Sequence, residues 1–189
     1  MDMDVTYSST WCVAPRCAGF TLVELMMTLA IIAILASTFS PAARLIGDTR
    51  LSNQVNIFAG HLSLARSEAI KHAEWVNICK SLDETTCDNS GQWHDGWIIF
   101  VDENRDRQRN PGEELIKVGA SDSPSVTIDY GGAHTSNYVV YKPTGRSPHN
   151  GTFTFCINQK GVHPRALVLF RGRVRSAREM PDGSPLTCP

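Results

Sequence analysis

Residues 19–39 read GFTLVELMMTLAIIAILASTF, and from Phe20 onward they are apolar except for Glu24 and a few Thr and Ser. A helix rises about 1.5 Å per residue, so the segment from Phe20 to Phe39 would extend about 30 Å, the thickness of a bilayer core. We therefore expect residues 20–40 to form a single-pass transmembrane helix.

Two features separate this segment from a secretory signal peptide and from an ordinary anchor. A signal peptide is cleaved after its apolar run, whereas here a polar leader ends in Cys17-Ala18-Gly19 before that run begins. A carboxylate at the depth of Glu24 costs about 2.5–3.5 kcal/mol on insertion scales. Because a buried carboxylate is tolerated only when it is paired, Glu24 is a candidate functional residue.

The stretch Gly19-Phe20-Thr21-Leu22-Val23-Glu24-Leu25 resembles the processing motif of type IV pilins, G-F-T-L-x-E-L. The resemblance implies that prepilin peptidase cleaves after Gly19, so that residues 1–19 are a leader, and that Phe20 becomes the N-methylated terminus. It also implies that Glu24 pairs with the terminal amine of a neighbouring subunit during assembly. The expected partners are major and minor pilins and the assembly platform of the bacterial inner membrane. The expected locations are that membrane, with the C-terminal domain in the periplasm, and the pilus at the cell surface.

The helix is expected to continue beyond the membrane segment. Pro41 could kink it or end it, because proline removes a backbone hydrogen bond. The periodicity favours continuation, since apolar residues recur at steps of four and three as one helical stripe. The stripe comprises Leu51, Val55, Phe58, Leu62, Ala65 and Ala69. We therefore predict an amphipathic helix over 41–73 that packs on a sheet, with His61 and His72 solvated on its polar side.

Short β-type runs separated by turn-rich segments follow the helix. They are Val76–Cys79, Trp97–Asp102, Leu115–Val118, Val126–Tyr130, Tyr138–Tyr141, Thr152–Ile157, Ala166–Phe170 and Arg173–Arg175. One long helix followed by strands predicts an α+β fold, with antiparallel sheets of residues 74–189 packed on the helix.

The rest of the chain resembles the FimT/GspH group of pilin-like proteins. Four segments carry the resemblance: 64–69 (LARSEA), 95–102 (DGWIIFVD), 110–114 (NPGEE) and the closing strands over 165–175. Members of the FimT/FimU type are minor pilins of type IV pili, and GspH members are minor pseudopilins of type II secretion. The resemblance therefore leaves two kinds of filament open.

Four cysteines remain once the leader is removed: Cys79, Cys87, Cys156 and Cys188. Thiols oxidise in the periplasm, and four cysteines allow three connectivities. We favour Cys79–Cys87, a short loop after a strand, and Cys156–Cys188, which would tie down the C-terminal tail. A zinc site is the rival interpretation, but the sequence lacks CxxC spacing.

Residues 102–113 have some of the spacing of a calcium loop, with acids or amides at Asp102, Asn104 and Asp106 and with Glu113 at the twelfth position. However, the sixth position is Arg107, where a calcium loop requires glycine. The alternative is a solvated turn held by local side-chain hydrogen bonds. We assign no metal.

The C-terminal strands carry a concentration of positive charge. Between positions 160 and 178 there are six basic residues and no acid: Lys160, Arg165, Arg171, Arg173, Arg175 and Arg178. The pattern predicts a hairpin that turns at Arg171-Gly172. Residues two apart share a face of a strand, so Arg173 and Arg175 should project together, about 7 Å apart, while Val174 faces the core.

The alternative interpretation is that these charged residues only protect an exposed sheet edge from aggregation. Six bases without an acid instead indicate an anionic partner. The net charge of −1 excludes polyanion binding by the chain as a whole, so any such binding must come from this local cluster. Gly172-Arg173-Val174-Arg175 resembles the G-R-x-R motif of DNA-binding FimT minor pilins. That resemblance implies that Arg173 and Arg175 contact DNA phosphates and that Gly172 permits the turn. No helix is available for the major groove, so binding should be independent of sequence. Few aromatic residues lie near these bases (Phe170), so base stacking should be minor.

The sequence contains none of the common catalytic or nucleotide-binding motifs, so we expect neither an enzyme nor a cofactor. Two hypotheses remain. One is a minor pilin that binds DNA for uptake in natural transformation. The other is a structural minor pilin or type II secretion pseudopilin that contacts only other pilins.

Overall fold

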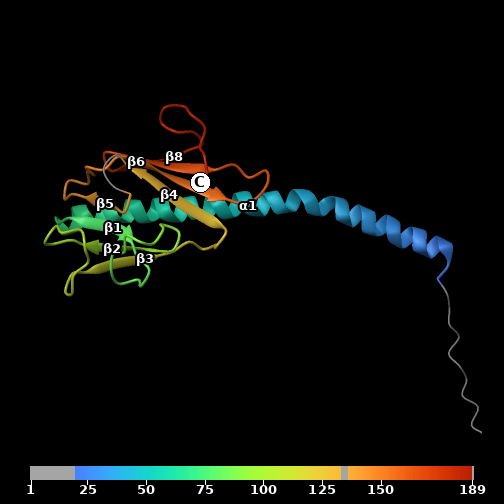
Figure 1. Cartoon of the computed structure of the whole chain (residues 1–189), viewed down its shortest axis with the longest axis horizontal. Helices are drawn as coiled ribbons and strands as arrows, with labels where there is room; N and C mark the ends of the chain where they lie inside the picture. The colour runs from blue at the N-terminus through green and yellow to red at the C-terminus, as the bar shows by residue number, and fades with distance from the viewer. Residues whose placement is uncertain (1–19, 133–135, 189) are drawn as a thin grey trace, which may run out of the picture. The chain divides into compact units, whose positions relative to one another are not determined.

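The computed structural model describes residues 20–132 and 136–188. Within these ranges it describes the side chains of all residues except 37–44. The predicted leader, including Gly19, lies outside the described residues. The chain forms two compact units, Met1–Ser40 and Pro41–Pro189 (Figure 1). Each is described here by itself.

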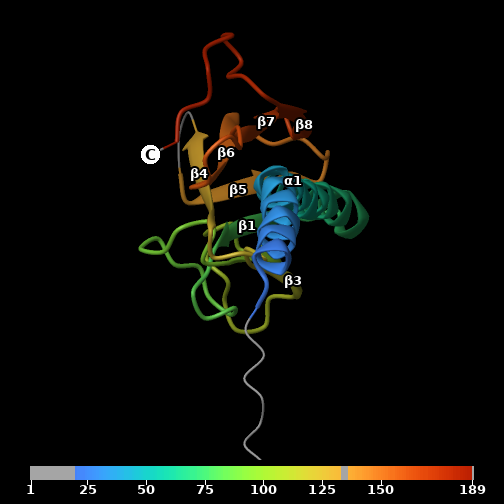
Figure 2. The same ribbon diagram turned by 90° about the vertical axis from the view of Figure 1, so that its right-hand side faces the viewer.

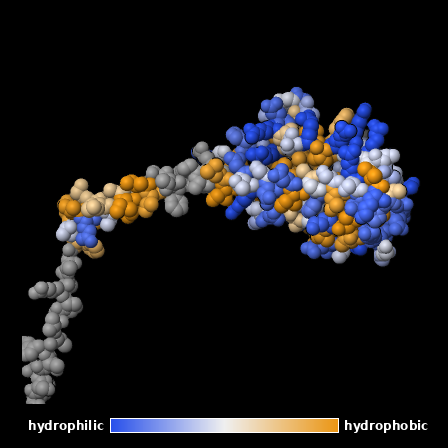
Figure 3. Space-filling model, turned by 180° about the vertical axis from the view of Figure 1, so that it is seen from behind, coloured by the Kyte–Doolittle hydropathy of each residue, from blue (hydrophilic) through white to orange (hydrophobic). Residues whose placement is uncertain are grey.

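Helix α1 spans Leu22–His72 and begins with a side-chain cap. The backbone N–H of Glu24 donates to Thr21 Oγ1 at 3.3 Å, as expected of an N-cap threonine. The large apolar side chains of the first unit, from Phe20 to Leu35, are 56–81% exposed, and Figure 3 shows this part of the helix as mainly hydrophobic. Within the part of the chain that the structure describes, no helix is long and apolar enough to cross a membrane.

In the second unit α1 carries the predicted apolar stripe, from Leu51 to Ala69, and every member is at most 4% exposed. The helix passes through Pro41 and ends at His72, so the alternative of a helix that stops at Pro41 is wrong. Ala73 follows with a positive φ of 54°, which takes the chain out of the helix towards the first strand.

Eight strands follow, arranged in two four-stranded antiparallel sheets, which confirms the predicted α+β fold (Figures 1 and 2). The first sheet has the order β3-β2-β1-β5 and the second β4-β6-β7-β8. Their bounds are β1 Val76–Lys80, β2 Trp97–Val101, β3 Leu115–Gly119, β4 Val126–Gly132, β5 Tyr138–Tyr141, β6 Gly151–Ile157, β7 Arg165–Phe170 and β8 Arg173–Ala177. The connection from β5 to β6 therefore carries the chain from one sheet to the other.

Both sheets share one core with α1. Its centre is aromatic: the ring of Phe58 lies 4.7–5.8 Å from the rings of Trp93, Trp97, Phe153 and Phe155. His61 lies at the margin of this cluster, where its Nδ1 accepts a hydrogen bond of 3.0 Å from Trp97 Nε1. The prediction that His61 is solvated is therefore wrong, because a helix residue outside the apolar stripe still reaches the indole of a buried tryptophan.

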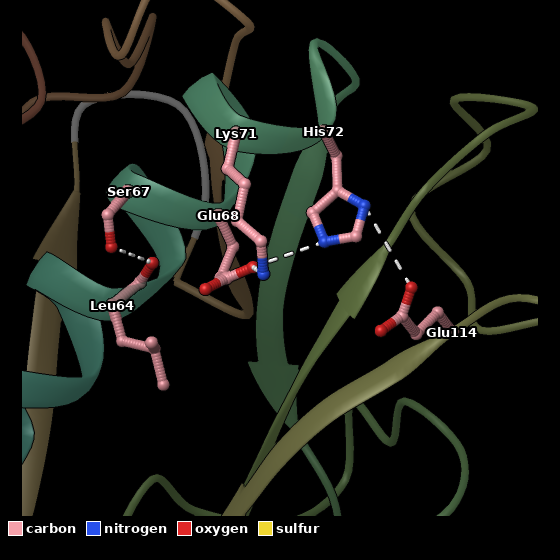
Figure 4. A network of polar contacts seen from close by, with 6 residues as sticks. All are labelled: Leu64, Ser67, Glu68, Lys71, His72 and Glu114. Atoms are coloured by element: carbon pink, nitrogen blue, oxygen red, sulfur yellow. Dashed lines mark hydrogen bonds and ion pairs between the residues drawn. The ribbon is translucent and has the colours of Figure 1, made fainter.

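A polar network joins the end of α1 to the start of β3 (Figure 4). Glu68 Oε2 lies 2.9 Å from Lys71 Nζ and 3.1 Å from His72 Nε2, and His72 Nδ1 lies 3.9 Å from a carboxylate oxygen of Glu114. The hydrogen bond from Lys71 is the main cause of the lowered pKa of Glu68. These contacts hold His72 against the domain, so it too is less solvated than the sequence suggested.

The structure contains both predicted disulfides. Cys79–Cys87 closes a loop after β1, and Cys156–Cys188 ties the C-terminal tail to β6. All four cysteines outside the predicted leader are therefore in disulfide bonds. None of these four is left as a thiolate for the rival zinc site.

Candidate nucleic-acid interface

The basic hairpin consists of β7 and β8 joined by the two-residue turn Arg171-Gly172. Both turn residues have positive φ, 50° and 84°, as a type I′ hairpin turn requires. The backbone N–H of Arg171 donates to Asn150 Oδ1 at 2.8 Å, and Gly172 is buried against residues 145–147 of the β5–β6 loop. The hairpin tip is thereby fixed to a loop that leaves the other sheet.

The pairing of β7 with β8 determines which side chains share a face. Arg173 is paired with Phe170 and Arg175 with Val168, while Val174 is paired with the core residue Leu169. Paired residues of an antiparallel ladder lie on the same face. Arg173 and Arg175 therefore project together from the outer face of the sheet, both are exposed, and Val174 packs against the core as predicted.

The structure divides the rest of the predicted basic set between the two ends of β7. Arg171 lies at the turn, beside Arg173. Arg165 and Arg178 instead line a cavity of about 560 Å³ together with the acids Asp48 and Glu179. Lys160 lies in the turn that precedes β7, at the end of that strand away from Arg171. Lys160, Arg165 and Arg178 therefore lie towards the end of β7 away from Arg171, and the role of all six bases in DNA binding stays a prediction.

Two arginines that the sequence analysis did not single out lie near the turn. Arg66 of α1 and Arg146 of the β5–β6 loop line a cavity of about 440 Å³ together with Phe170, Arg171 and Arg173. Their positions are eighty residues apart in the sequence, and no spacing rule relates either to the hairpin. The packing of Gly172 on the β5–β6 loop, and of Gly145 beside Arg66, brings them together.

The charge of this region is not neutralised by neighbouring acids. Among the described residues, the ion pairs involve Glu68, Lys71, His72 and Glu114, and none includes Arg66, Arg146, Arg171, Arg173 or Arg175. The guanidinium of Arg171 lies 5.2 Å from the centre of the Phe170 ring, a cation–π contact that leaves its charge intact. The arrangement can therefore attract and hold an anion.

The loop over residues 102–113 is closed by hydrogen bonds from its own backbone. Asp102 Oδ2 accepts from the N–H of Arg107, and the two carboxylate oxygens of Glu113 accept from the N–H groups of Glu103 and Asn110. Burial raises the pKa of Asp102. The described residues contain no group of three or more His, Cys, Asp or Glu able to hold a metal ion.

The residues of the predicted processing and assembly site lie in the first unit. Phe20 precedes α1 and is 81% exposed, and Glu24 lies in the first turn with its side chain exposed. The roles of Gly19, Phe20 and Glu24 stay predictions.

Comparison with known proteins identifies the family. The family described as type II transport protein GspH matches residues 54–172, and the prokaryotic N-terminal methylation motif matches residues 14–40. The chain belongs to the GspH family. The pilin-like protein PilA1 of Thermus thermophilus is 26% identical over 162 residues, in a match that covers 83% of this chain and 96% of that protein.

The crystal structure of the type IV minor pilin FimU of Pseudomonas aeruginosa has the same fold. It superposes with a TM-score of 0.54 over 67% of this chain and 87% of that chain, at 19% identity. Together these comparisons make this GspH-family chain a type IV minor pilin or pseudopilin of the FimT/GspH type.

Proposed function

We propose that this chain is a minor subunit of a type IV pilus and that it binds DNA without sequence specificity, for uptake in natural transformation. The observation that supports DNA binding is the outer face of the hairpin. There Arg173 and Arg175 project side by side, with Arg171 at the adjoining turn, and the described residues offer these three no acidic partner.

The geometry of the hairpin favours contacts to phosphate over contacts to bases. Side chains two residues apart on a strand are separated by about 7 Å, close to the spacing of phosphates along a nucleic-acid strand. Helix α1 is packed into the core over its second half and is not available to enter a major groove. Guanidinium groups bind phosphate oxygens through paired N–H donors, and such contacts carry no sequence information.

The N-terminal segment supplies the second part of the proposal, which is membrane insertion and assembly. We propose cleavage by prepilin peptidase after Gly19, methylation of Phe20, and insertion of residues 20–40 in the inner membrane with the rest of the chain in the periplasm. Glu24 then pairs with the terminal amine of a neighbouring pilin at the assembly platform. The match to the methylation motif and the exposed apolar side chains of this segment support these steps.

DNA binding is tested with the full-length chain in detergent micelles and a fluorescent duplex of random sequence, at about 50 and about 200 mM salt. We expect binding that weakens steeply with salt. Arg173→Ala together with Arg175→Ala should weaken DNA binding about tenfold or more. The slope of log K against log salt should fall by about 2, because each lost phosphate contact lowers that slope by about 0.9.

The matched control for this test is Arg50→Ala with Lys117→Ala. It removes the same charge from exposed positions on α1 and on β3 of the other sheet. Loss of binding in both double variants, or in neither, would show that the hairpin is not the site.

A structural subunit without a nucleic-acid partner is the second candidate. The match to the family described as type II transport protein GspH supports a pseudopilin of a secretion system. Absence of DNA binding at low salt, in a chain that still assembles with other pilins, would favour this role.

A further inference from the structure

Phe170 and Arg173 line two hollows on the surface of the hairpin. One is the cavity that Arg66, Arg146 and Arg171 also line. The other is a groove of about 730 Å³. Phe170 is 57% exposed, which is high for a phenylalanine next to a packed sheet.

The arginine cavity has the chemistry of a phosphate site. Its four lining arginines come from three parts of the chain, namely α1, the β5–β6 loop and the hairpin, and none of its lining residues is acidic. Arg66 is half-buried, and a Cβ at Gly145 would lie only 3.2 Å from its Nε, so the loop backbone passes directly beside the guanidinium. Guanidinium groups only donate hydrogen bonds, so such a cavity favours an anion with several acceptor oxygens.

The groove is mainly apolar. One row across the sheet lines it, in which Gly131 is paired with Thr152, Thr152 with Val168, and Val168 with Arg175. Pro181 of the C-terminal tail lines it as well. The groove therefore combines a mainly apolar surface and an exposed aromatic ring with two arginines, Arg173 and Arg175.

A phosphate site and a mainly apolar groove that share an exposed ring match the repeating unit of an unpaired nucleic-acid strand. A base can stack on a phenylalanine ring only when it is not already stacked and paired within a duplex. Duplex DNA presents its phosphates but keeps its bases inside, so it could use the arginines and not the groove.

We propose that this site prefers single-stranded nucleic acid, with a phosphate held by Arg66, Arg146, Arg171 and Arg173 and the adjacent base placed on Phe170 in the apolar groove. The inference rests on the proposed DNA binding and specifies the form of DNA that is bound. It also adds Arg66 and Arg146 to the interface.

The test compares two probes on the full-length chain in detergent micelles by fluorescence anisotropy. One is a single-stranded oligonucleotide of mixed sequence. The other is the corresponding duplex with both ends closed by non-nucleotide linkers, so that it presents no unpaired bases. We expect the single strand to bind about tenfold more tightly, and Phe170→Ala to remove that preference while changing duplex binding little.

Further variants separate stacking, charge and folding. Phe170→Trp keeps an aromatic surface and should retain the preference, whereas Leu82→Ala truncates another exposed apolar residue and should leave both affinities unchanged. Arg66→Ala with Arg146→Ala should lower the salt slope for the single strand by about 1.4, from about 0.7 for each contact. The control variant with Arg50→Ala and Lys117→Ala should leave this salt slope unchanged.

Equal binding of the two probes, with no effect of Phe170→Ala, would overturn this inference and leave the proposed function standing. Absence of binding to either probe would overturn the proposed function itself. An unchanged salt slope in the Arg66, Arg146 double variant would remove these two residues from the site.

Discussion

Gly172 lies directly against Gly145: a Cβ at Gly172 would be 2.7 Å from the carbonyl oxygen of Gly145. The same Cβ would be 2.8 Å from the backbone nitrogen of Ser147, and φ at Gly172 is 84°. Any other residue would therefore meet rigid backbone atoms in a conformation that side chains disfavour. The glycine of the Gly172-Arg173-Val174-Arg175 motif is required by this contact between the hairpin and the β5–β6 loop.

Gly172→Ala should destabilise the domain by about 1–3 kcal/mol, since it combines left-handed backbone strain with a backbone clash. Gly183→Ala is the matched control. Gly183 has almost the same φ, 83°, but a Cβ there has no neighbour within 4 Å, so only the conformational penalty of about 1 kcal/mol applies. Urea denaturation of both variants measures the difference, and equal losses would contradict the contact with Gly145.

The pair of His61 and Trp97 should make stability depend on pH. Burial, and to a lesser degree the charge of Lys117, lowers the pKa of His61 below its ordinary value of 6.5. The unfolded chain therefore binds a proton more readily than the folded one, and stability should fall as the pH decreases from about 7 to about 5. Protonation of Nδ1 would also remove the acceptor for Trp97 Nε1.

His61→Gln should flatten this dependence, because glutamine can still accept the hydrogen bond and does not titrate. The measurement is urea denaturation of both chains at about pH 7 and about pH 5. A pH dependence that is the same in the two chains would mean that His61 is protonated equally in the folded and unfolded states.

The two disulfides should differ in the stability that they provide. Cys156–Cys188 closes a loop with a sequence separation of 32 and Cys79–Cys87 one of 8. By chain entropy, removing the longer one by alanine substitution of both cysteines should cost about 3–4 kcal/mol, about 1 kcal/mol more than removing the shorter one. Denaturation under oxidising conditions measures both losses, and a larger loss for the shorter loop would contradict the entropic explanation.

Asp102 should be destabilising when it is ionised. It is fully buried, its Oδ1 has no hydrogen-bond partner among the described residues, and burial raises its pKa. A raised pKa means that the folded state holds the proton more tightly, so the penalty is present at neutral pH and diminishes as the pH falls. Asp102→Asn should therefore raise the urea midpoint at about pH 7, with a smaller gain at about pH 4.

The same pair of proteins tests the calcium interpretation of the loop over 102–113. With a chelator present, the asparagine variant should be the more stable. If added calcium raises the stability of the unmodified chain and not that of the variant, Asp102 is a metal ligand, contrary to our assignment.

Glu24→Leu should separate processing from assembly. We expect the precursor to be cleaved when it is co-expressed with a prepilin peptidase, since the Gly19-Phe20 junction is kept, but not to enter the filament, since the acceptor for a neighbour's amine is gone. Immunoblots of whole cells and of sheared pili measure the two steps, with Gly60→Ala, at a helix position where a Cβ meets no neighbour, as the control. Normal incorporation of the leucine variant would refute the assembly role.

The elements of the fold could be read from the sequence because their signals are local. The stripe from Leu51 to Ala69 has the period of a helix, and strand runs such as 97–101 and 166–170 are bounded by turn residues, so the α+β class followed from short-range patterns. The side-chain directions of Arg173 and Arg175 followed in the same way, from the two-residue period of a strand.

The composition of the site could not be read in this way, because it depends on contacts between distant segments. Arg66 and Arg146 reach the hairpin turn through the packing of Gly172 on the β5–β6 loop and of Gly145 beside Arg66, while Arg165 and Arg178 line another cavity. The hydrogen bond between Trp97 Nε1 and His61 Nδ1 likewise joins two distant segments, α1 and β2. The hydrophobic period and the positions of charged residues are properties of the sequence. Which charged residues lie close together depends on the register and packing of the sheets, which exist only in the folded chain.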